Sequence, residues 1–293
     1  MTYKKKPSWL KMPSRGSEEA AEVRSILRKY NLNTVCRQAK CPNLGHCFQR
    51  GTATFLILGN LCTRSCRYCA IEHNEGILDP PDAGEPDRIA EASAEMNLRY
   101  VVITSVTRDD LQDGGADHFG KTVEAVRKKI PGVRIEVLTP DFLGSEDALR
   151  TIANSKPDVF NHNLETVERL FPDVRPEASY GMSLDLIELY GRLSPDTPRK
   201  SGLMLGLGEK EREIRIALQD LRKRGVTMLT LGQYLQPSRM HWPVDSYLTP
   251  DEFSSWKDEA LRMGFVSVAS GPLVRSSFHA DESFPASGAG PDI

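Results

Sequence analysis

The 293-residue chain has no long apolar run, no large excess of charge of one sign and no cysteine after residue 69. Its longest apolar stretches, such as Thr54–Leu58 and Tyr100–Ile103, have the length of strands and fall well short of the roughly 18 residues of a membrane span. Lys and Arg number 38 and Asp and Glu 40, a net charge of −2, so bulk attraction to nucleic acid or to a membrane surface is not expected. The composition also excludes collagen-like, coiled-coil and strongly disordered chains.

Apolar runs typical of strands alternate with amphipathic helical runs over most of the chain. Strands are predicted at Ala53–Gly59, Tyr100–Ser105, Arg134–Thr139, Val159–Leu164, Gly202–Leu207, Met228–Tyr234 and Phe265–Ala269. Helices are predicted at Glu18–Tyr30, Pro86–Asn97, Asp117–Lys129, Ser145–Ser155, Gly181–Leu193, Glu211–Arg224 and Thr249–Met263. The strand runs are continuously apolar, which favours a parallel sheet covered by helices.

This alternation predicts an α/β fold, namely a partial (β/α)6-type TIM barrel with its chemistry at the carboxyl ends of the strands. A doubly wound dinucleotide-binding sheet is the competing interpretation. Its GxGxxG signature is absent after the first strand, and Gly206-Leu207-Gly208 contains only a GxG. The acidic run Asp109, Asp110 and Asp113 is expected to cap a helix.

The six cysteines form two groups of three within a short part of the chain. Cys62, Cys66 and Cys69 form a CxxxCxxC directly after the first predicted strand, and Cys36, Cys41 and Cys47 form a CxxxxCxxxxxC before it. Three thiolates on one loop can bind three irons of a 4Fe–4S cluster and leave the fourth iron open to a small molecule. Two groups of three therefore predict two clusters, each short of one cysteine ligand.

Zinc and disulfides are the alternatives for these cysteines. A structural zinc site needs four closed ligands, and His46 or His73 would have to be the fourth. Disulfide pairing would leave the separation into two groups of three unexplained. Clustered thiols without a secretory signal instead favour a reduced, cytoplasmic setting in which they bind metal.

With these motifs the chain resembles the lipoyl synthase family of the radical S-adenosylmethionine superfamily. The CxxxCxxC with the aromatic Tyr68 before its third cysteine is similar to the superfamily signature, and the earlier CxxxxCxxxxxC is similar to the motif that distinguishes this family within it. Arg275-Ser276-Ser277-Phe278 resembles the family's RSSY motif, with Phe278 in place of Tyr. The resemblance extends from about Lys6 to Ala280.

The resemblance implies a role for each group of residues. Cys62, Cys66 and Cys69 would bind the cluster that holds S-adenosylmethionine, and Cys36, Cys41 and Cys47 would bind an auxiliary cluster completed by Ser277. Residues 1–51 and 271–293 would be extensions that carry the auxiliary site, and residues 52–270 the radical S-adenosylmethionine barrel. Further candidate contacts with S-adenosylmethionine are Tyr68 beside the adenine and Asn163, Glu165 and Arg175 at the ribose and the methionine carboxylate. Among these, Arg175 suits a carboxylate because a guanidinium binds it bidentately.

The reaction implied is sulfur insertion at carbons 6 and 8 of an octanoyl chain on a lipoyl-carrier protein. Unactivated C–H bonds resist acid–base catalysis, so the cofactor must supply the difficult step, here a 5′-deoxyadenosyl radical from S-adenosylmethionine. The auxiliary cluster would donate the sulfur. Implied partners are the octanoylated carrier, a reductant such as ferredoxin or flavodoxin, and an iron–sulfur carrier that rebuilds the cluster, with no nucleic acid and no membrane. The alternatives are another radical enzyme that inserts sulfur, such as a biotin synthase-like one, and a zinc-stabilised interaction module without catalysis.

Overall fold

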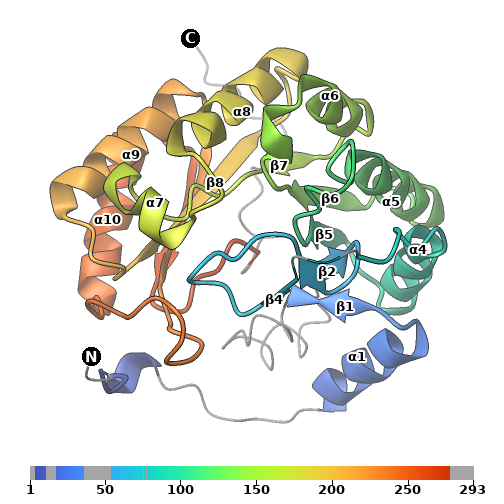
Figure 1. Ribbon diagram of the computed structural model, residues 1–293, viewed down its shortest axis with the longest axis horizontal. Helices are drawn as coiled ribbons and strands as arrows, with labels where there is room; N and C mark the ends of the chain where they lie inside the picture. The colour runs from blue at the N-terminus through green and yellow to red at the C-terminus, as the bar shows by residue number, and fades with distance from the viewer. Residues whose placement is uncertain (1–3, 11–17, 36–53, 75, 77, 278–293) are drawn as a thin grey trace.

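The computed structural model describes residues 4–10, 18–35, 54–74, 76 and 78–277, which form a curved, mainly parallel sheet surrounded by helices (Figure 1). The strands are β1 (Asn33–Thr34), β2 (Thr54–Ile57), β3 (Leu61–Cys62), β4 (Glu72–His73), β5 (Tyr100–Ser105), β6 (Arg134–Leu138), β7 (Val159–Asn161), β8 (Arg199–Leu205), β9 (Met228–Gln233) and β10 (Ser267–Gly271). The α-helices are α1 (Glu18–Lys29), α4 (Glu85–Glu95), α5 (Ala116–Lys129), α6 (Glu146–Asn154), α7 (Phe171–Val174), α8 (Tyr180–Leu193), α9 (Glu211–Lys223) and α10 (Pro250–Arg262). Short 3-10 helices are η1 (Ser8–Leu10), η2 (Phe142–Gly144) and η3 (Glu168–Leu170).

The strand order shows a singly wound barrel. The main sheet runs β1-β2-β5-β6-β7-β8-β9-β10, and β3 and β4 form a separate pair. Within the main sheet, from β2 onward, each strand lies beside the next one along the chain, and these neighbours are parallel. A doubly wound sheet would reverse its order at a switch point, and this sheet does not. The described strands leave edges at β1 and β10, so the predicted partial TIM barrel is confirmed.

The predicted elements agree closely with the observed ones because their apolar periodicity was strong. Helix α5, for example, spans Ala116–Lys129, one residue longer than predicted, and β5 has the predicted bounds. The bounds differ most at β8, which runs from Arg199 to Leu205 and not from Gly202 to Leu207, and β7 ends at Asn161 and not at Leu164. The last strand is also shifted. It begins at Ser267 and not at Phe265, because pairing with β9 starts at Ser267 opposite Met228 and the preceding Val266 is 63% exposed. Ala53 of the first predicted strand lies outside the described residues.

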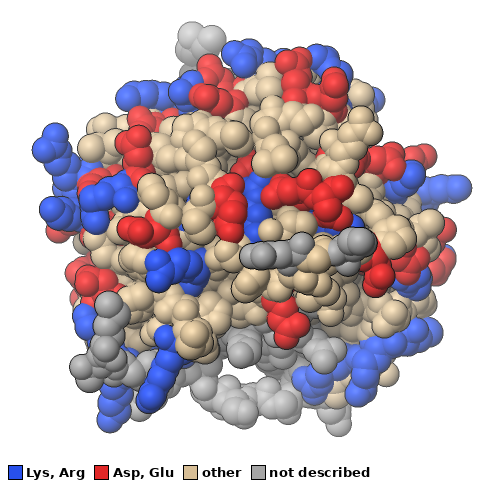
Figure 2. All heavy atoms as spheres, viewed as in Figure 1, with Lys and Arg blue, Asp and Glu red and all other residues tan. Residues whose placement is uncertain are grey.

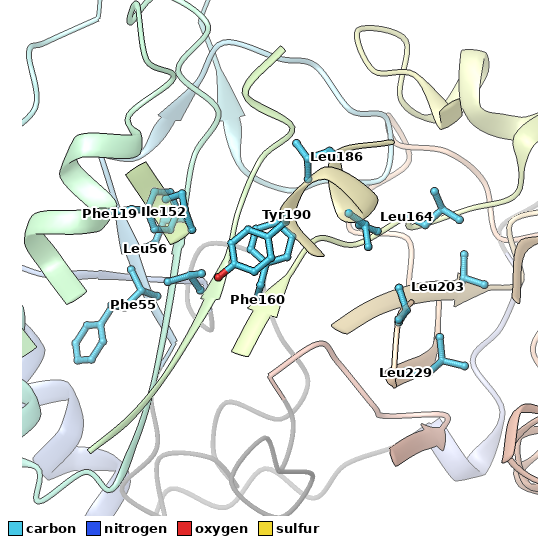
Figure 3. Close-up of a cluster of buried hydrophobic side chains, with 14 of the residues drawn as sticks. Phe55, Leu56, Phe119, Ile152, Phe160, Leu164, Leu186, Tyr190, Leu203 and Leu229 are labelled. Carbon is cyan, nitrogen blue, oxygen red and sulfur yellow. The ribbon is translucent and has the colours of Figure 1, made fainter. Parts of the chain in front are cut away.

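Alternate residues of a strand point to opposite faces of the sheet, so some side chains face the helices and others face the inside of the barrel. Val101 and Ile103 of β5 face the helices and belong to the main hydrophobic core, whereas Tyr100 and Val102 form a separate cluster on the opposite, inner side of the barrel. In the core between sheet and helices, Phe160 of β7 stacks on Tyr190 of α8 with ring centroids 3.7 Å apart (Figure 3).

The inner side of the barrel is strongly polar. The Glu136 carboxylate accepts hydrogen bonds from the Tyr100 hydroxyl at 2.8 Å, from the Asn161 amide at 2.8 Å and from the Lys200 ammonium at 3.0 Å. These four residues lie on the consecutive strands β5, β6, β7 and β8, and all four are buried. A buried ion pair contributes little net stability compared with apolar packing, so this barrel interior is arranged for something other than stability alone.

The surface carries interspersed charges. Basic and acidic side chains lie next to each other over the face seen in Figure 2. None of the helices in the described part of the chain has the length and the hydrophobicity that crossing a membrane requires.

We predict that Phe160→Ala lowers the free energy of unfolding by about 3–5 kcal/mol, because it removes a fully buried ring and leaves a cavity beside Tyr190. Val266→Ala is the control, since that side chain is mostly exposed and its loss should change the free energy of unfolding by less than about 0.5 kcal/mol. Chemical denaturation measures both. Equal effects of the two substitutions would contradict this assignment of the core.

Candidate active site at the carboxyl ends of the strands

The loop with Cys62, Cys66 and Cys69 leaves the carboxyl end of β2 and crosses the mouth of the barrel (Figure 1). The loop is held in shape by the small parallel pair β3 and β4, in which Cys62 lies opposite His73. All three described cysteines are free thiols. The sulfur of Cys62 accepts hydrogen bonds from the backbone N–H groups of Arg64 at 3.4 Å and Thr107 at 3.3 Å. These two backbone donors hold the sulfur in place.

Arg64, between the first two cysteines, anchors the loop to the barrel. Its guanidinium pairs with Asp141 through two hydrogen bonds of 2.6 Å, and with Asp109 through bonds of 2.6 and 2.9 Å. Asp109 follows β5 and Asp141 follows β6, so one side chain connects the cysteine loop to two strand ends. Asp141 is buried, which raises its carboxyl pKa, but the hydrogen bonds and charge of Arg64 outweigh this and hold the pKa below its usual value.

The long loop between β9 and α10 supports the cysteine loop from another side. The His241 Nε2–H donates to the carbonyl oxygen of Cys69 at 2.9 Å, and the Trp242 N–H donates to that of Arg67 at 2.7 Å. The exposed guanidinium of Arg67 lies 4.9 Å from the centre of the Trp242 ring. The cysteine loop is therefore held from β5, β6 and the β9–α10 loop.

Burial favours the protonated form of two of the thiols, Cys66 and Cys69. Burial raises the pKa of Cys69 to about 12, although a hydrogen bond from the Ile71 backbone opposes the shift and the nearby Cys66 and Cys62 add to it. Burial likewise raises the pKa of Cys66, against the positive charge of Arg175. The nearby Cys62 is one cause of the raised pKa of both Cys66 and Cys69, so the three thiols lie close together, and the positive charge of a bound cluster would favour the ionised forms of Cys66 and Cys69.

The chemistry of the donor set suits an iron–sulfur cluster. Within the described ranges, no three His, Cys, Asp or Glu side chains gather closely enough to hold one metal ion. A 4Fe–4S cluster distributes its thiolates over several irons and so needs them further apart than the four ligands of one zinc ion. The donor set of three loop thiols thus fits the cluster predicted for it.

The structure brings together the predicted contacts for S-adenosylmethionine. Asn163 and Glu165 follow β7, and the Asn163 Nδ2 donates to a Glu165 oxygen at 3.0 Å. The Arg175 guanidinium donates to the backbone carbonyl oxygen of Asn163 at 3.1 Å. Burial raises the pKa of Glu165, although Arg175 and Asn163 oppose this, and burial beside Glu165 also raises the pKa of Tyr68. All four predicted contacts therefore lie together beside the cysteine loop.

Several buried polar atoms near the strand ends have no hydrogen-bond partner among the described residues. They are Ser105 Oγ after β5, Thr139 Oγ1 after β6, and His162 Nε2, Asn163 Oδ1 and Arg175 Nε in the segment after β7. A buried polar group without a partner costs free energy, so such a group indicates a ligand or an ordered water. Donors and acceptors in this mixture fit the hydroxyl, ammonium and carboxylate groups of a nucleoside joined to an amino acid.

His162 is one functional candidate that the sequence did not single out. Its Nδ1–H donates to the Thr139 carbonyl oxygen at 2.9 Å, which leaves Nε2 as a bare acceptor. Burial, together with the charge of Arg175, lowers its pKa to about 4, so the ring is neutral at physiological pH. The sequence motif Asn161-His162-Asn163 gave no sign of this, because the partner carbonyl lies on another strand.

Ser277 contacts the first strand of the main parallel run, whereas the serine before it contacts a residue after β7. Its hydroxyl oxygen accepts a hydrogen bond of 2.8 Å from Thr54 Oγ1 at the start of β2. The neighbouring Ser276 accepts a bond of 2.5 Å from Asn163 Nδ2. The other predicted ligands of the auxiliary cluster, Cys36, Cys41 and Cys47, lie outside the described residues.

The acidic residues after β5 have two different roles: one caps a helix and two pair with arginines. Asp113 does cap a helix, since its carboxylate accepts from the N–H groups of Gly115 and Asp117 at the start of α5. Asp109 instead pairs with Arg64, and Asp110 pairs with Arg108. The expected capping role was therefore wrong for Asp109 and Asp110. The fold places Arg64 beside Asp109, and Arg108 lies only two residues before Asp110.

Comparisons with known proteins show the family of this chain. A family model described as "Radical SAM superfamily" matches residues 56–221. Curated proteins named "Lipoyl synthase" are similar over nearly the whole chain: that of Methylobacillus flagellatus is 51% identical over 96% of this chain and 86% of its own length, and that of Syntrophotalea carbinolica is 53% identical over 94% and 89%.

Solved structures with little sequence identity share the fold. Methylornithine synthase has a TM-score of 0.57 at 14% identity and covers 87% of this chain and 72% of its own. The FeFe-hydrogenase maturase HydG from Carboxydothermus hydrogenoformans has a TM-score of 0.59 at 16% identity, over 73% of this chain and 52% of its own. Fold and cysteine loop thus define a radical S-adenosylmethionine protein. Within that superfamily, the chain belongs to the lipoyl synthase family.

We predict that Arg64→Ala destabilises the protein by about 3–5 kcal/mol, because it leaves the carboxylate of Asp141 buried without its partner. The same substitution should lower the iron content of reconstituted protein, since the loop loses its anchor. Arg67→Ala is the matched control in the same loop. Its exposed contact with Trp242 is worth at most about 1 kcal/mol. Thermal unfolding and iron analysis measure both, and equal losses in the two variants would contradict the anchoring role.

Proposed function

We propose that this chain inserts sulfur at carbons 6 and 8 of an octanoyl chain carried on a lysine of a lipoyl-carrier protein. The observation that carries the proposal is the loop of three free cysteines across the barrel mouth, surrounded by buried polar atoms without partners. Membership of the lipoyl synthase family supports the substrate. When bound, the iron–sulfur clusters and S-adenosylmethionine supply the electron, the carbon radical and the sulfur that the reaction needs.

The cysteine loop would hold the first cluster through Cys62, Cys66 and Cys69. Arg64 keeps the loop seated on β5 and β6, and His241 positions the carbonyl of Cys69. Arg175 offers its unpartnered Nε–H to a carboxylate of S-adenosylmethionine, while Asn163 Oδ1 offers an acceptor to a hydroxyl or ammonium group. Glu165 orients the amide of Asn163, and Tyr68 lies beside Glu165 at the edge of the site.

The auxiliary cluster would be held by Cys36, Cys41 and Cys47 of the N-terminal extension, residues 1–51, and by Ser277 of the C-terminal extension, residues 271–293. The support from the described residues is the position of Ser277, which faces into the barrel and accepts a hydrogen bond from Thr54. A donated hydrogen bond stabilises negative charge on the serine oxygen, which favours an oxygen ligand that can bind iron and also leave it. An enclosed barrel also keeps water away from a reactive intermediate.

The remaining partners follow from the chemistry proposed. Reductive cleavage needs a one-electron donor such as ferredoxin or flavodoxin, and a cluster that gives up its sulfide must be rebuilt by an iron–sulfur carrier. Free, reduced cysteines suit the cytoplasm, where we place the reaction.

Anaerobically reconstituted protein, given a peptide with an octanoylated lysine, S-adenosylmethionine and dithionite, is expected to yield a peptide that has gained two sulfur atoms. Mass spectrometry of the peptide and chromatography of 5′-deoxyadenosine follow the two products. Release of 5′-deoxyadenosine with an unchanged peptide would assign the chain another sulfur acceptor, as in the biotin synthase-like alternative. A colourless, zinc-containing protein that releases none would exclude the proposed chemistry altogether.

The contact between Thr54 and Ser277 gives a second prediction. Thr54→Val keeps the shape of the side chain but removes the hydrogen bond to Ser277, so we expect sulfur insertion to slow by about fivefold to tenfold while cleavage of S-adenosylmethionine is unchanged. Thr122→Val is the control, because it removes an equally buried threonine hydroxyl that bonds within helix α5. Single-turnover assays compare the two products. If Thr54→Val slowed the cleavage of S-adenosylmethionine as much as sulfur insertion, the hydrogen bond would not act through Ser277 alone, and the prediction would be wrong.

A further inference from the structure

The segment after β10 turns back into the barrel and lies against β9. A Cβ atom at Gly232 of β9 would lie 2.1 Å from the carbonyl oxygen of Val274, so only glycine permits this close approach. We call residues 271–277 the serine segment. Its backbone position is therefore set by the sheet, and its two serines are presented to the barrel interior.

The two serines of this segment contact different walls of the barrel. Ser277 accepts its hydrogen bond from Thr54 on β2, whereas Ser276 accepts from Asn163 after β7. In the sheet, β5 and β6 separate β2 from β7. The serine segment thus bridges the barrel interior and connects the first strand with the segment that holds the predicted S-adenosylmethionine contacts.

The side-chain amide of Asn163 donates two hydrogen bonds, but its oxygen accepts none from the described residues. Its two N–H groups donate to Ser276 Oγ at 2.5 Å and to a Glu165 carboxylate oxygen at 3.0 Å, and the carboxylate, which only accepts, fixes which side of the amide is nitrogen. Its oxygen Oδ1 is buried and has no partner among the described residues. This oxygen faces Gly202 on β8, where a Cβ atom would lie only 3.0 Å from it. The amide therefore holds a buried acceptor without a partner, in one orientation, beside β8.

We propose that Ser276 is a positioning residue that couples the serine segment to the S-adenosylmethionine site through Asn163. Ser276 and Glu165 hold its amide in one orientation, so that Oδ1 receives a hydroxyl or ammonium donor of S-adenosylmethionine. This rests on the function proposed above. It gives the two neighbouring serines separate tasks: Ser277 serves the auxiliary cluster, and Ser276 orders the binding site for the nucleoside.

Coupling of this kind acts in both directions. If Ser276 improves the binding of S-adenosylmethionine through Asn163, then bound S-adenosylmethionine must stabilise the contact between Asn163 and Ser276 by the same factor. Binding of the nucleoside at one side of the barrel then orders the segment that carries Ser277 at the other. The serine ligand would be held most firmly when the radical source is in place.

A double-mutant cycle tests the coupling with a binding readout. The dissociation constant of S-adenosylmethionine is measured by anaerobic equilibrium dialysis for reconstituted wild type, Ser276→Ala, Asn163→Ala and the double variant. We expect Ser276→Ala to weaken binding about fivefold to tenfold, the range for loss of one ordering hydrogen bond. The double variant should bind as Asn163→Ala does, because Ser276 acts only through Asn163. Ser270→Ala, which removes a hydrogen bond from the serine of β10 to Phe253, is the matched control and should bind as wild type does.

Hydrogen exchange provides the reciprocal measurement. In wild type, S-adenosylmethionine should slow amide exchange in residues 271–277, and in Asn163→Ala it should not. Suppose that wild type binds S-adenosylmethionine but the two substitutions have additive effects on the dissociation constant, or that binding does not change amide exchange in residues 271–277. Either result would overturn the coupling, while the proposed function would stand. A reconstituted wild type that does not bind S-adenosylmethionine at all would refute the proposed function and this inference with it.

Discussion

The buried guanidinium of Arg64, held between the carboxylates of Asp109 and Asp141, is the interaction on which the site depends. The cysteine loop has little regular structure of its own beyond the two-residue strands β3 and β4. Without an anchor, three thiols on such a loop would not keep the separation that a cluster requires. Because parallel strands bring their carboxyl ends to one edge, two carboxylates that are 32 residues apart in sequence can bind the same side chain.

This anchor also explains how burial and charge are balanced at the barrel mouth. Burial disfavours ionised thiols, and it raises the pKa of both Cys66 and Cys69. Arg64 and Arg175 bring positive charge close to the loop, but Arg64 is already paired with two carboxylates. Burial therefore favours the protonated forms of Cys66 and Cys69, and a bound, positively charged cluster would offset this. The polar interior below it, with Glu136 and Lys200 paired across strands, belongs to the same pattern of a barrel arranged around ligands.

Much of the fold could be predicted from the sequence, because each strand and helix has strong local periodicity and the strands follow one another in order. Element ends were less certain where tertiary pairing decides them, as at Ser267 in β10. The predicted contacts Asn163, Glu165 and Arg175 do lie together, which their spacing after one strand made predictable. The partners of Arg64, the supporting His241 and the contact of Thr54 with Ser277 were not predictable, since they join segments that are distant in sequence.

The two serines show the limit of motif reasoning most clearly. The motif distinguishes Ser276 from Ser277 only by position, whereas the structure gives them different donors on different walls of the barrel. The two residues are chemically identical. Their environments differ only because of the path that the backbone takes past Gly232.

Electron paramagnetic resonance of a variant with Cys36, Cys41 and Cys47 all changed to Ala tests the central claim most directly. The reconstituted, dithionite-reduced variant should show one 4Fe–4S cluster bound by Cys62, Cys66 and Cys69, and its signal should change when S-adenosylmethionine binds the open iron. A variant without a cluster signal, or with a signal that S-adenosylmethionine leaves unchanged, would contradict the account.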